Sequence, residues 1–226
     1  MGFLGRCLGT LLYRVEIEGL EHFPRSGPTL VLVKHQRNED IPLGFHYVLT
    51  ARRLDSWCIM KHDLAAPHLL GIVLKSGGIP IDRDRPMRSR RYFRMAREVL
   101  HAGRALVLFP EQTFFVNEMG PGKLPGFRYL TKRAAGDLQV VSVGLDYIPA
   151  RAHSRLFDRL FGRFLKRTRA IFRISRPRTL SPIETQDQNS QAEFLHERMG
   201  EIARLTNLKY PHAVVRRVGV TKSTDI

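Results

Sequence analysis

Short runs of apolar residues alternate along this chain with longer segments in which apolar residues recur at helical spacing. Strands are expected where the runs are apolar throughout or alternate with polar residues, at residues 13–18, 29–33, 56–60, 79–82, 105–109 and 139–145. Helices are expected at residues 41–51, 64–74, 90–101 and 128–135, and a Gly- and Pro-rich loop at 117–125. Because strands and helices alternate, the pattern predicts an α/β fold, with a mixed, mostly parallel sheet flanked by helices in a single domain.

The composition adds a strong positive charge to this picture. The length predicts one domain over residues 1–226 with a sizeable core, and the polar tail at 218–226 is expected to be disordered. The net charge of +16 favours an anionic partner, such as nucleic acid, an acidic lipid or a phosphorylated ligand. The two cysteines form no C-x-x-C motif, and His62 and His68 lack ligand spacing, so neither a disulfide framework nor a metal site is predicted.

The segment 31–40 holds the first candidate for chemistry. An apolar, β-branched run ends in His35, and Asp40 follows five positions later. A histidine at the end of a strand lies at the rim of a sheet, where substrates bind. An aspartate about one turn further on can hold the imidazole in one tautomer and stabilise its protonated form. The spacing therefore favours an oriented general base, and the alternative is a strand-end histidine bonded only to backbone.

Two later segments give this pair its weight. They read Gly-Gly-Ile-Pro-Ile-Asp-Arg at 77–83 and Leu-Phe-Pro-Glu-Gln-Thr at 108–113. Together with 34–40, they resemble in order and spacing the signature blocks of the glycerolipid acyltransferase family, which includes lysophosphatidic acid and glycerol-3-phosphate acyltransferases. The family pattern is N-H-x4-D, then G-x-I-x-[IV]-x-R, then F-P-E-G-T-R, then a V-P-V-type block, which 140–143 matches. The resemblance spans residues 15–178, most of the chain.

The resemblance implies an enzyme that moves an acyl chain from a thioester to a hydroxyl. No acyl-enzyme and no cofactor are expected, since acyl-CoA or acyl-carrier protein is itself the donor substrate. By resemblance, His35 is the catalytic base and Asp40 orients it. Arg83 is expected to grip the acceptor's phosphate, and Glu111 to help bind the acceptor or to order the site. Thr113 is placed with Arg83 and Glu111 among the substrate-binding residues.

Three positions depart from the family pattern. Lys34 stands where the family has Asn, Gln112 where it has Gly, and Phe114 where it has Arg. The loss of that Arg removes a candidate phosphate ligand, which Lys123 or Arg128 could replace. The departures therefore bear on the identity of the acceptor rather than on acyl transfer.

A basic amphipathic segment lies near residues 154–168. Six apolar residues recur in it at helical spacing, with Arg and Lys between them: Leu156, Phe157, Leu160, Phe161, Phe164 and Leu165. This pattern is typical of a helix at a membrane interface, and equally of an amphipathic helix packed on a sheet. Because a lysolipid lies in a bilayer, the six residues are predicted to face a membrane. The protein is then expected to be peripheral, on the cytoplasmic face of a membrane with an anionic surface.

The predicted function is transfer of an acyl chain to the hydroxyl of a lysophospholipid such as 1-acylglycerol-3-phosphate, in phospholipid biosynthesis. One alternative acceptor is glycerol-3-phosphate or a non-phosphate lipid alcohol. Another alternative is a non-catalytic basic module that binds membrane or nucleic acid, whose function would not depend on His35. The sequence carries no RNP or helix-turn-helix signature, so nucleic acid is the weaker partner. Acceptor identity, acyl chain length, the choice of donor and the oligomeric state are left open.

Overall fold

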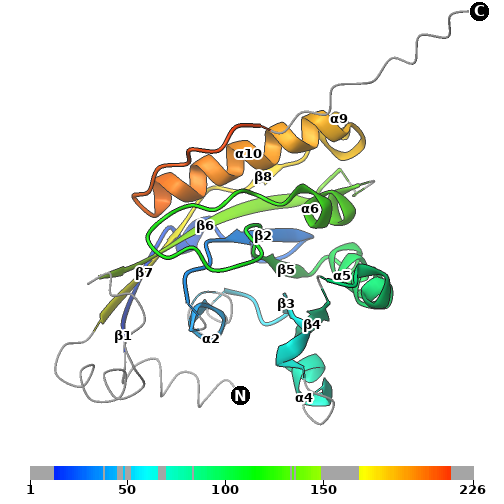
Figure 1. The fold of residues 1–226 in the computed structure, drawn as a ribbon, viewed down its shortest axis with the longest axis horizontal. Helices are drawn as coiled ribbons and strands as arrows, with labels where there is room; N and C mark the ends of the chain where they lie inside the picture. The colour runs from blue at the N-terminus through cyan, green and yellow to red at the C-terminus, as the bar shows by residue number, and fades with distance from the viewer. Residues whose placement is uncertain are drawn as a thin grey trace, which may run out of the picture.

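The computed structural model describes residues 13–37, 39–44, 48, 52–65, 70–82, 84–132, 134, 136–148 and 168–214. One sheet of eight strands runs through this part of the chain (Figure 1). Its strands are β1 Tyr13–Glu18, β2 Thr29–Val33, β3 Ser56–Lys61, β4 Gly78–Ile81, β5 Ala105–Leu108, β6 Gln139–Ile148, β7 Thr168–Ile174 and β8 Arg178–Thr179. Their order across the sheet is β1-β7-β6-β2-β5-β3-β4, and β8 pairs with the start of β6.

Five neighbouring strands of this sheet are parallel. They are β4, β3, β5, β2 and β6, while β7 and β8 run antiparallel to β6, and β1 runs parallel to β7. The sheet is therefore mixed and mostly parallel, as the sequence pattern predicts. Strand β2 lies between β5 and β6, so its carboxyl end opens at the middle of one sheet edge, where ligands bind in folds of this class.

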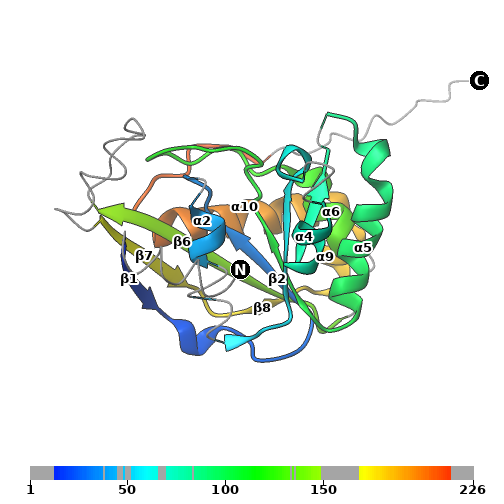
Figure 2. The ribbon, with the colours of Figure 1, turned by 90° about the horizontal axis from the view of Figure 1, so that it is seen from below.

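Helices lie on both faces of the sheet. They are α2 Asp40–Leu43, α4 Leu70–Lys75, α5 Arg90–His101, α6 Leu124–Thr131, α9 Pro182–Gln186 and α10 Gln188–Leu205. The long helix α10 packs along β6 and contacts α6 and α9, and α2 lies on the opposite face (Figures 1 and 2). All five residues of β2 are buried, and the four from Leu30 to Val33 alternate between two apolar clusters, one on each face. This burial on both faces explains why β2 is a continuous apolar run.

The predicted helices agree with the structure to different degrees. Helix α5 spans the predicted residues 90–101. The expected helix at 64–74 is instead a short 3-10 turn, His62–Leu64, followed by α4, with 66–69 outside the described residues. Helix α6 begins at Leu124, four residues before its predicted start, because Pro125 lies in its first turn, where a proline costs no hydrogen bond.

Candidate active site

The site is built at the carboxyl end of β2, a central strand of the sheet. His35 lies just beyond the end of β2, and Asp40 is the first residue of α2, which lies against the sheet close to that point (Figure 2). Glu111 follows the next strand of the sheet, β5, and Tyr147 lies near the end of β6 on the other side of β2. Three adjacent parallel strands and α2 therefore bring these four side chains to one place.

The carboxylate of Asp40 holds the imidazole of His35. Nδ1 of His35 lies 3.1 Å from Oδ2 of Asp40, which also accepts the backbone N–H groups of Gln36 at 2.6 Å and Arg37 at 2.8 Å. The hydroxyl of Tyr147 donates to the other oxygen, Oδ1, at 2.6 Å. Burial, followed by the negative charge of Asp40, raises the pKa of Tyr147 well above its ordinary value, so the phenol keeps its proton and remains a donor. Four donors fix this carboxylate in one orientation.

Two aromatic rings enclose the imidazole of His35. The ring of Phe109 stacks on it with centroids 4.2 Å apart, and the ring of Phe114 lies against it at 4.3 Å. The side chain of His35 keeps 9% of its surface exposed. Since Nδ1 meets Asp40, and Nε2 has no hydrogen-bond partner among the described residues, Nε2 is the nitrogen left for a substrate.

A buried ion pair lies beneath the end of β2, where His35 is placed. Nζ of Lys34 lies 3.0 and 2.9 Å from the two oxygens of Glu111 and donates to the backbone oxygen of Phe115 at 2.8 Å. Glu111 in turn accepts the backbone N–H of His35 at 3.3 Å and that of Gly120 at 2.6 Å. Neither charged side chain reaches solvent. Burial lowers the pKa of Lys34 and raises that of Glu111, and in both cases the partner's charge opposes the effect of burial.

The loop after Glu111 has an unusual backbone at its second residue. Gln112, at the family's glycine position, has φ 62°, in the left-handed region that glycine adopts most readily. Its backbone N–H donates to the oxygen of Phe109 at 3.1 Å, which closes a tight turn. The backbone N–H of Phe115 donates to the oxygen of His35 at 3.2 Å. The turn thus sets Phe114, two residues after Gln112, beside the imidazole of His35. The family has an arginine at the position of Phe114.

The predicted site residues are placed as follows. The structure brings His35, Asp40 and Glu111 into direct contact, and Thr113 lies exposed on the same loop. Glu111 is buried and bonded within the protein, so of its two expected roles the geometry favours ordering the site. Arg83 and the six predicted membrane-facing residues lie outside the described residues.

Sequence reasoning missed the contribution of Tyr147. The predicted strand at 139–145 stopped two residues short of it, whereas β6 continues to Ile148. A longer reading of the alternating pattern could have placed Tyr147 on the strand. Nothing in its local sequence marks it as a partner of Asp40, because the two are 107 positions apart.

Two cavities adjoin Phe109. The first has a volume of about 550 Å³ and lies between the ends of β3, β4 and β5 and the helices α5 and α6. The second is a narrow apolar crevice of about 20 Å³ on the opposite face, lined among others by Val33, Val107, Val143 and Asp40. Both are apolar in most of their lining, but only the first has the volume of a small-molecule site.

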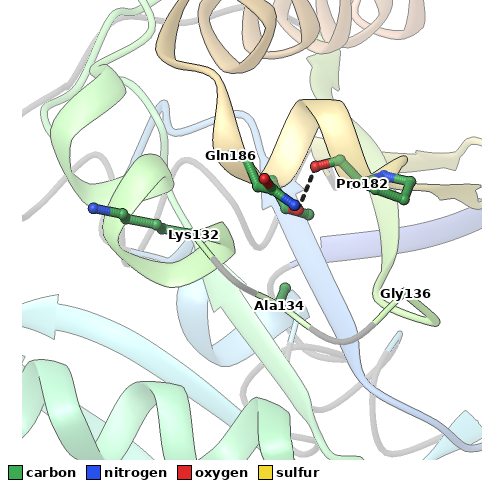
Figure 3. A pocket seen from close by; sticks show the side chains of 6 residues that line it. Lys132, Ala134, Gly136, Pro182 and Gln186 are labelled. Carbon is green, nitrogen blue, oxygen red and sulfur yellow. Dashed lines mark hydrogen bonds between the residues drawn. The ribbon is translucent and has the colours of Figure 1, made fainter.

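A further cavity of about 610 Å³ lies away from this edge, between the end of α6 and α9 (Figure 3). Its lining includes Lys132, Gly136, Pro182 and Thr185, and the hydroxyl of Thr185 donates to the backbone oxygen of Pro182 at 2.8 Å. Gly136 precedes β6, so this cavity lies where the parallel strands begin, at the opposite edge of the sheet from His35. We assign it no part in the chemistry.

Within the described ranges, no group of three or more His, Cys, Asp or Glu side chains is arranged to hold a metal ion. In the same part of the chain, no helix has both the length and the apolar character needed to span a bilayer.

Comparison with known proteins identifies the family and the fold. The model of the family described as Acyltransferase matches residues 14–146, more than half of the chain. The chain is also similar to the crystal structure of the 1-acyl-sn-glycerophosphate (LPA) acyltransferase PlsC from Thermotoga maritima, with 21% sequence identity and a TM-score of 0.59. That similarity covers 89% of this chain and 77% of the other. No curated protein matches the chain.

Proposed function

Because the chain belongs to the acyltransferase family, we propose that it transfers an acyl chain from acyl-CoA or acyl-carrier protein to the hydroxyl of a lysophospholipid such as 1-acylglycerol-3-phosphate. The observation that carries the proposal is the His35–Asp40 pair at the edge of the sheet, 3.1 Å apart, with Nε2 of His35 left for a substrate. An imidazole held at Nδ1 by a carboxylate is suited to take a proton at Nε2.

In the proposed reaction, the acceptor hydroxyl gives its proton to Nε2 of His35 as its oxygen attacks the carbonyl carbon of the thioester. The tetrahedral intermediate then breaks its C–S bond, and the departing thiolate takes the proton back from the imidazolium. The products are a new ester and a free thiol. Asp40 stabilises the imidazolium while it exists, and its own four donors keep it from turning away.

The direct test is thiol release by the purified protein, with acyl-CoA and acyl-carrier protein as donors and a panel of acceptors. The panel contains 1-acylglycerol-3-phosphate, lysophospholipids with other headgroups, glycerol-3-phosphate and a neutral lipid alcohol. We expect thiol release to depend on a lysophospholipid acceptor. Thiol release that no acceptor accelerates would contradict the proposal.

A second acceptor class has one specific observation in its favour. Phe114 stands where the family has an arginine, and its ring lies against His35 rather than presenting a cation. An apolar wall beside the base suits an acceptor that brings no phosphate close to the reacting hydroxyl. The neutral lipid alcohol in the panel tests this alternative, which holds if that acceptor is used best.

Tyr147→Phe tests the orientation of the catalytic pair. The substitution keeps the ring, which packs against Tyr13 and under the guanidinium of Arg37, and removes only the donor to Asp40. A hydrogen bond to a charged group contributes roughly 1.5–3 kcal/mol, so we expect kcat to fall roughly tenfold or more while the KM of both substrates is unchanged. Steady-state kinetics on the purified variant measures the two constants separately.

The control for this experiment is Tyr13→Phe, a hydroxyl deletion in the neighbouring ring, which is also buried. It should leave kcat near its original value. An equal loss of kcat in both variants, or a change in KM alone, would show that Tyr147 acts through packing rather than through Asp40.

Peripheral membrane binding is part of this proposal. Its support is the basic amphipathic pattern at 154–168 and the bilayer location of a lysolipid, since the segment lies outside the described residues. The protein should cosediment with vesicles containing anionic lipid and be released by salt, because headgroup attraction is screened over about 8–10 Å. Replacing Phe161 and Phe164 with serine should reduce this binding. Equal binding to neutral vesicles at high salt would argue against the proposal.

A further inference from the structure

The cavity of about 550 Å³ carries an excess of positive charge. Arg90 and Arg94 line it from successive turns of α5, and Lys123 lines it from the residue before α6. The lining contains one carboxylate, that of Asp82, whose Oδ1 accepts the backbone N–H groups of Asp84 at 3.1 Å and Arg85 at 2.9 Å. Three cations therefore face this cavity against one acid that is already engaged in a turn.

None of the three cations is neutralised within the described part of the chain. No carboxylate there lies within ion-pair distance of Arg90, Arg94 or Lys123. Other arginines of the molecule are paired, as Arg53 is with Asp55 at 2.7 Å and Arg198 with Glu201 at 2.8 Å. Like charges around one cavity repel each other, so this arrangement favours an anion between them.

The remaining lining makes the cavity suitable for part of an amphipathic substrate. Phe93 and Tyr129 form an aromatic wall, with ring centroids 5.3 Å apart. Gln112 contributes a neutral amide. Phe109 links the cavity to His35, because its ring also stacks on the imidazole. The volume lies within the range of small-molecule sites.

We propose that this cavity is a phosphate-binding subsite, in which Arg90, Arg94 and Lys123 hold a phosphate ester of a substrate and Gln112 meets the same molecule nearer to His35. Guanidinium groups suit phosphate because they donate two parallel hydrogen bonds. The three cations lie outside the sequence blocks at 77–83 and 108–113 that carry the family resemblance, and they replace the charge lost at Phe114. The inference rests on the proposed function only in identifying the substrate that carries the phosphate. That substrate is the acceptor, through its headgroup, or acyl-CoA, through its nucleotide.

Direct binding tests the subsite without any assay of activity. The probes are glycerol 3-phosphate, which represents the acceptor's headgroup, and adenosine 3′,5′-bisphosphate, which represents the nucleotide of CoA. Isothermal titration calorimetry of the whole chain with each probe gives its Kd. We expect the double variant Arg90→Ala, Arg94→Ala to bind one of the probes at least about tenfold more weakly. The probe whose Kd rises identifies the substrate whose phosphate binds in this cavity.

The matched control is Arg91→Ala, on the same helix, whose guanidinium lies over Tyr92 at 4.8 Å and does not line the cavity. It should bind both probes as the original protein does. Lys123→Ala, on the opposite wall, should weaken the same probe as the α5 double variant. All of these side chains are exposed, and matching circular dichroism spectra establish that the variants fold.

Three results would overturn the inference. They are an original protein that binds neither probe, a double variant that binds both as tightly as the original, and an Arg91→Ala variant that loses as much affinity. His35→Ala separates this question from the proposed function, since it should retain probe binding whatever happens to its activity.

Discussion

Replacing His35 with alanine is expected to lower kcat by about 10²–10⁴-fold, the usual contribution of a general base. The reason is that, in the proposed reaction, Nε2 of His35 accepts the proton of the attacking hydroxyl, with Nδ1 held by Asp40 at 3.1 Å. Because the donor thioester and the acceptor bind largely through other residues, KM should change much less than kcat. Thiol release at saturating substrate measures the effect.

The imidazole also packs between Phe109 and Phe114, so His35→Gln serves as a second variant that fills more of the same space. Both variants should fold and both should lose turnover. His101→Ala, at the exposed end of α5, is the control and should be fully active. Near-normal turnover by a folded His35→Ala protein would remove His35 from the mechanism.

Breaking the pair of Lys34 and Glu111 is expected to cost about 3–5 kcal/mol of the free energy of unfolding. Lys34→Met leaves the carboxylate of Glu111 buried without its cation, and Glu111→Leu leaves the ammonium of Lys34 buried without its anion. The penalty arises from an uncompensated charge away from water, which exceeds the contribution of the pair itself. Urea denaturation of each single variant gives the loss.

The double variant Lys34→Met, Glu111→Leu should recover a large part of the stability lost by either single variant. Two buried apolar side chains avoid the desolvation penalty, although the backbone N–H groups of His35 and Gly120 still lose their acceptor. Arg169→Ala, which breaks the exposed pair of Arg169 with Glu16, should have little effect and serves as the reference. If the double variant is as unstable as the sum of the single ones, the ion pair is not the cause.

The local parts of this site could be predicted from the sequence. His35 and Asp40 are five positions apart, so the strand end and the following helical turn bring them together without any long-range information. The sheet order explains why Glu111 joins them, because a family resemblance places it after β5, the strand that neighbours β2. The fold class followed from alternating strands and helices, and the identification of the family followed from three ordered blocks rather than from any one.

The long-range parts could not be read in the same way. Lys34 reads as a departure from the family's asparagine, and only the structure pairs it with Glu111, 77 positions away. Tyr147 reaches Asp40 because β6 lies beside β2 and extends past it, a matter of register between distant strands. The sequence predicts the helix at 90–101 but not the neighbours of its cations, and only packing places Arg90 and Arg94 at the cavity next to Phe109.

The segment after β2 is held to the protein by side-chain anions. The backbone N–H groups of His35, Gln36 and Arg37 donate in succession to Glu111, Asp40 and Asp40, and not to a neighbouring strand. In hydrogen–deuterium exchange, the protection of these three amides therefore reports the engagement of two carboxylates rather than the stability of a β ladder. A substrate that tightens the catalytic edge will slow these amides first, so its binding becomes visible in the intact enzyme without turnover.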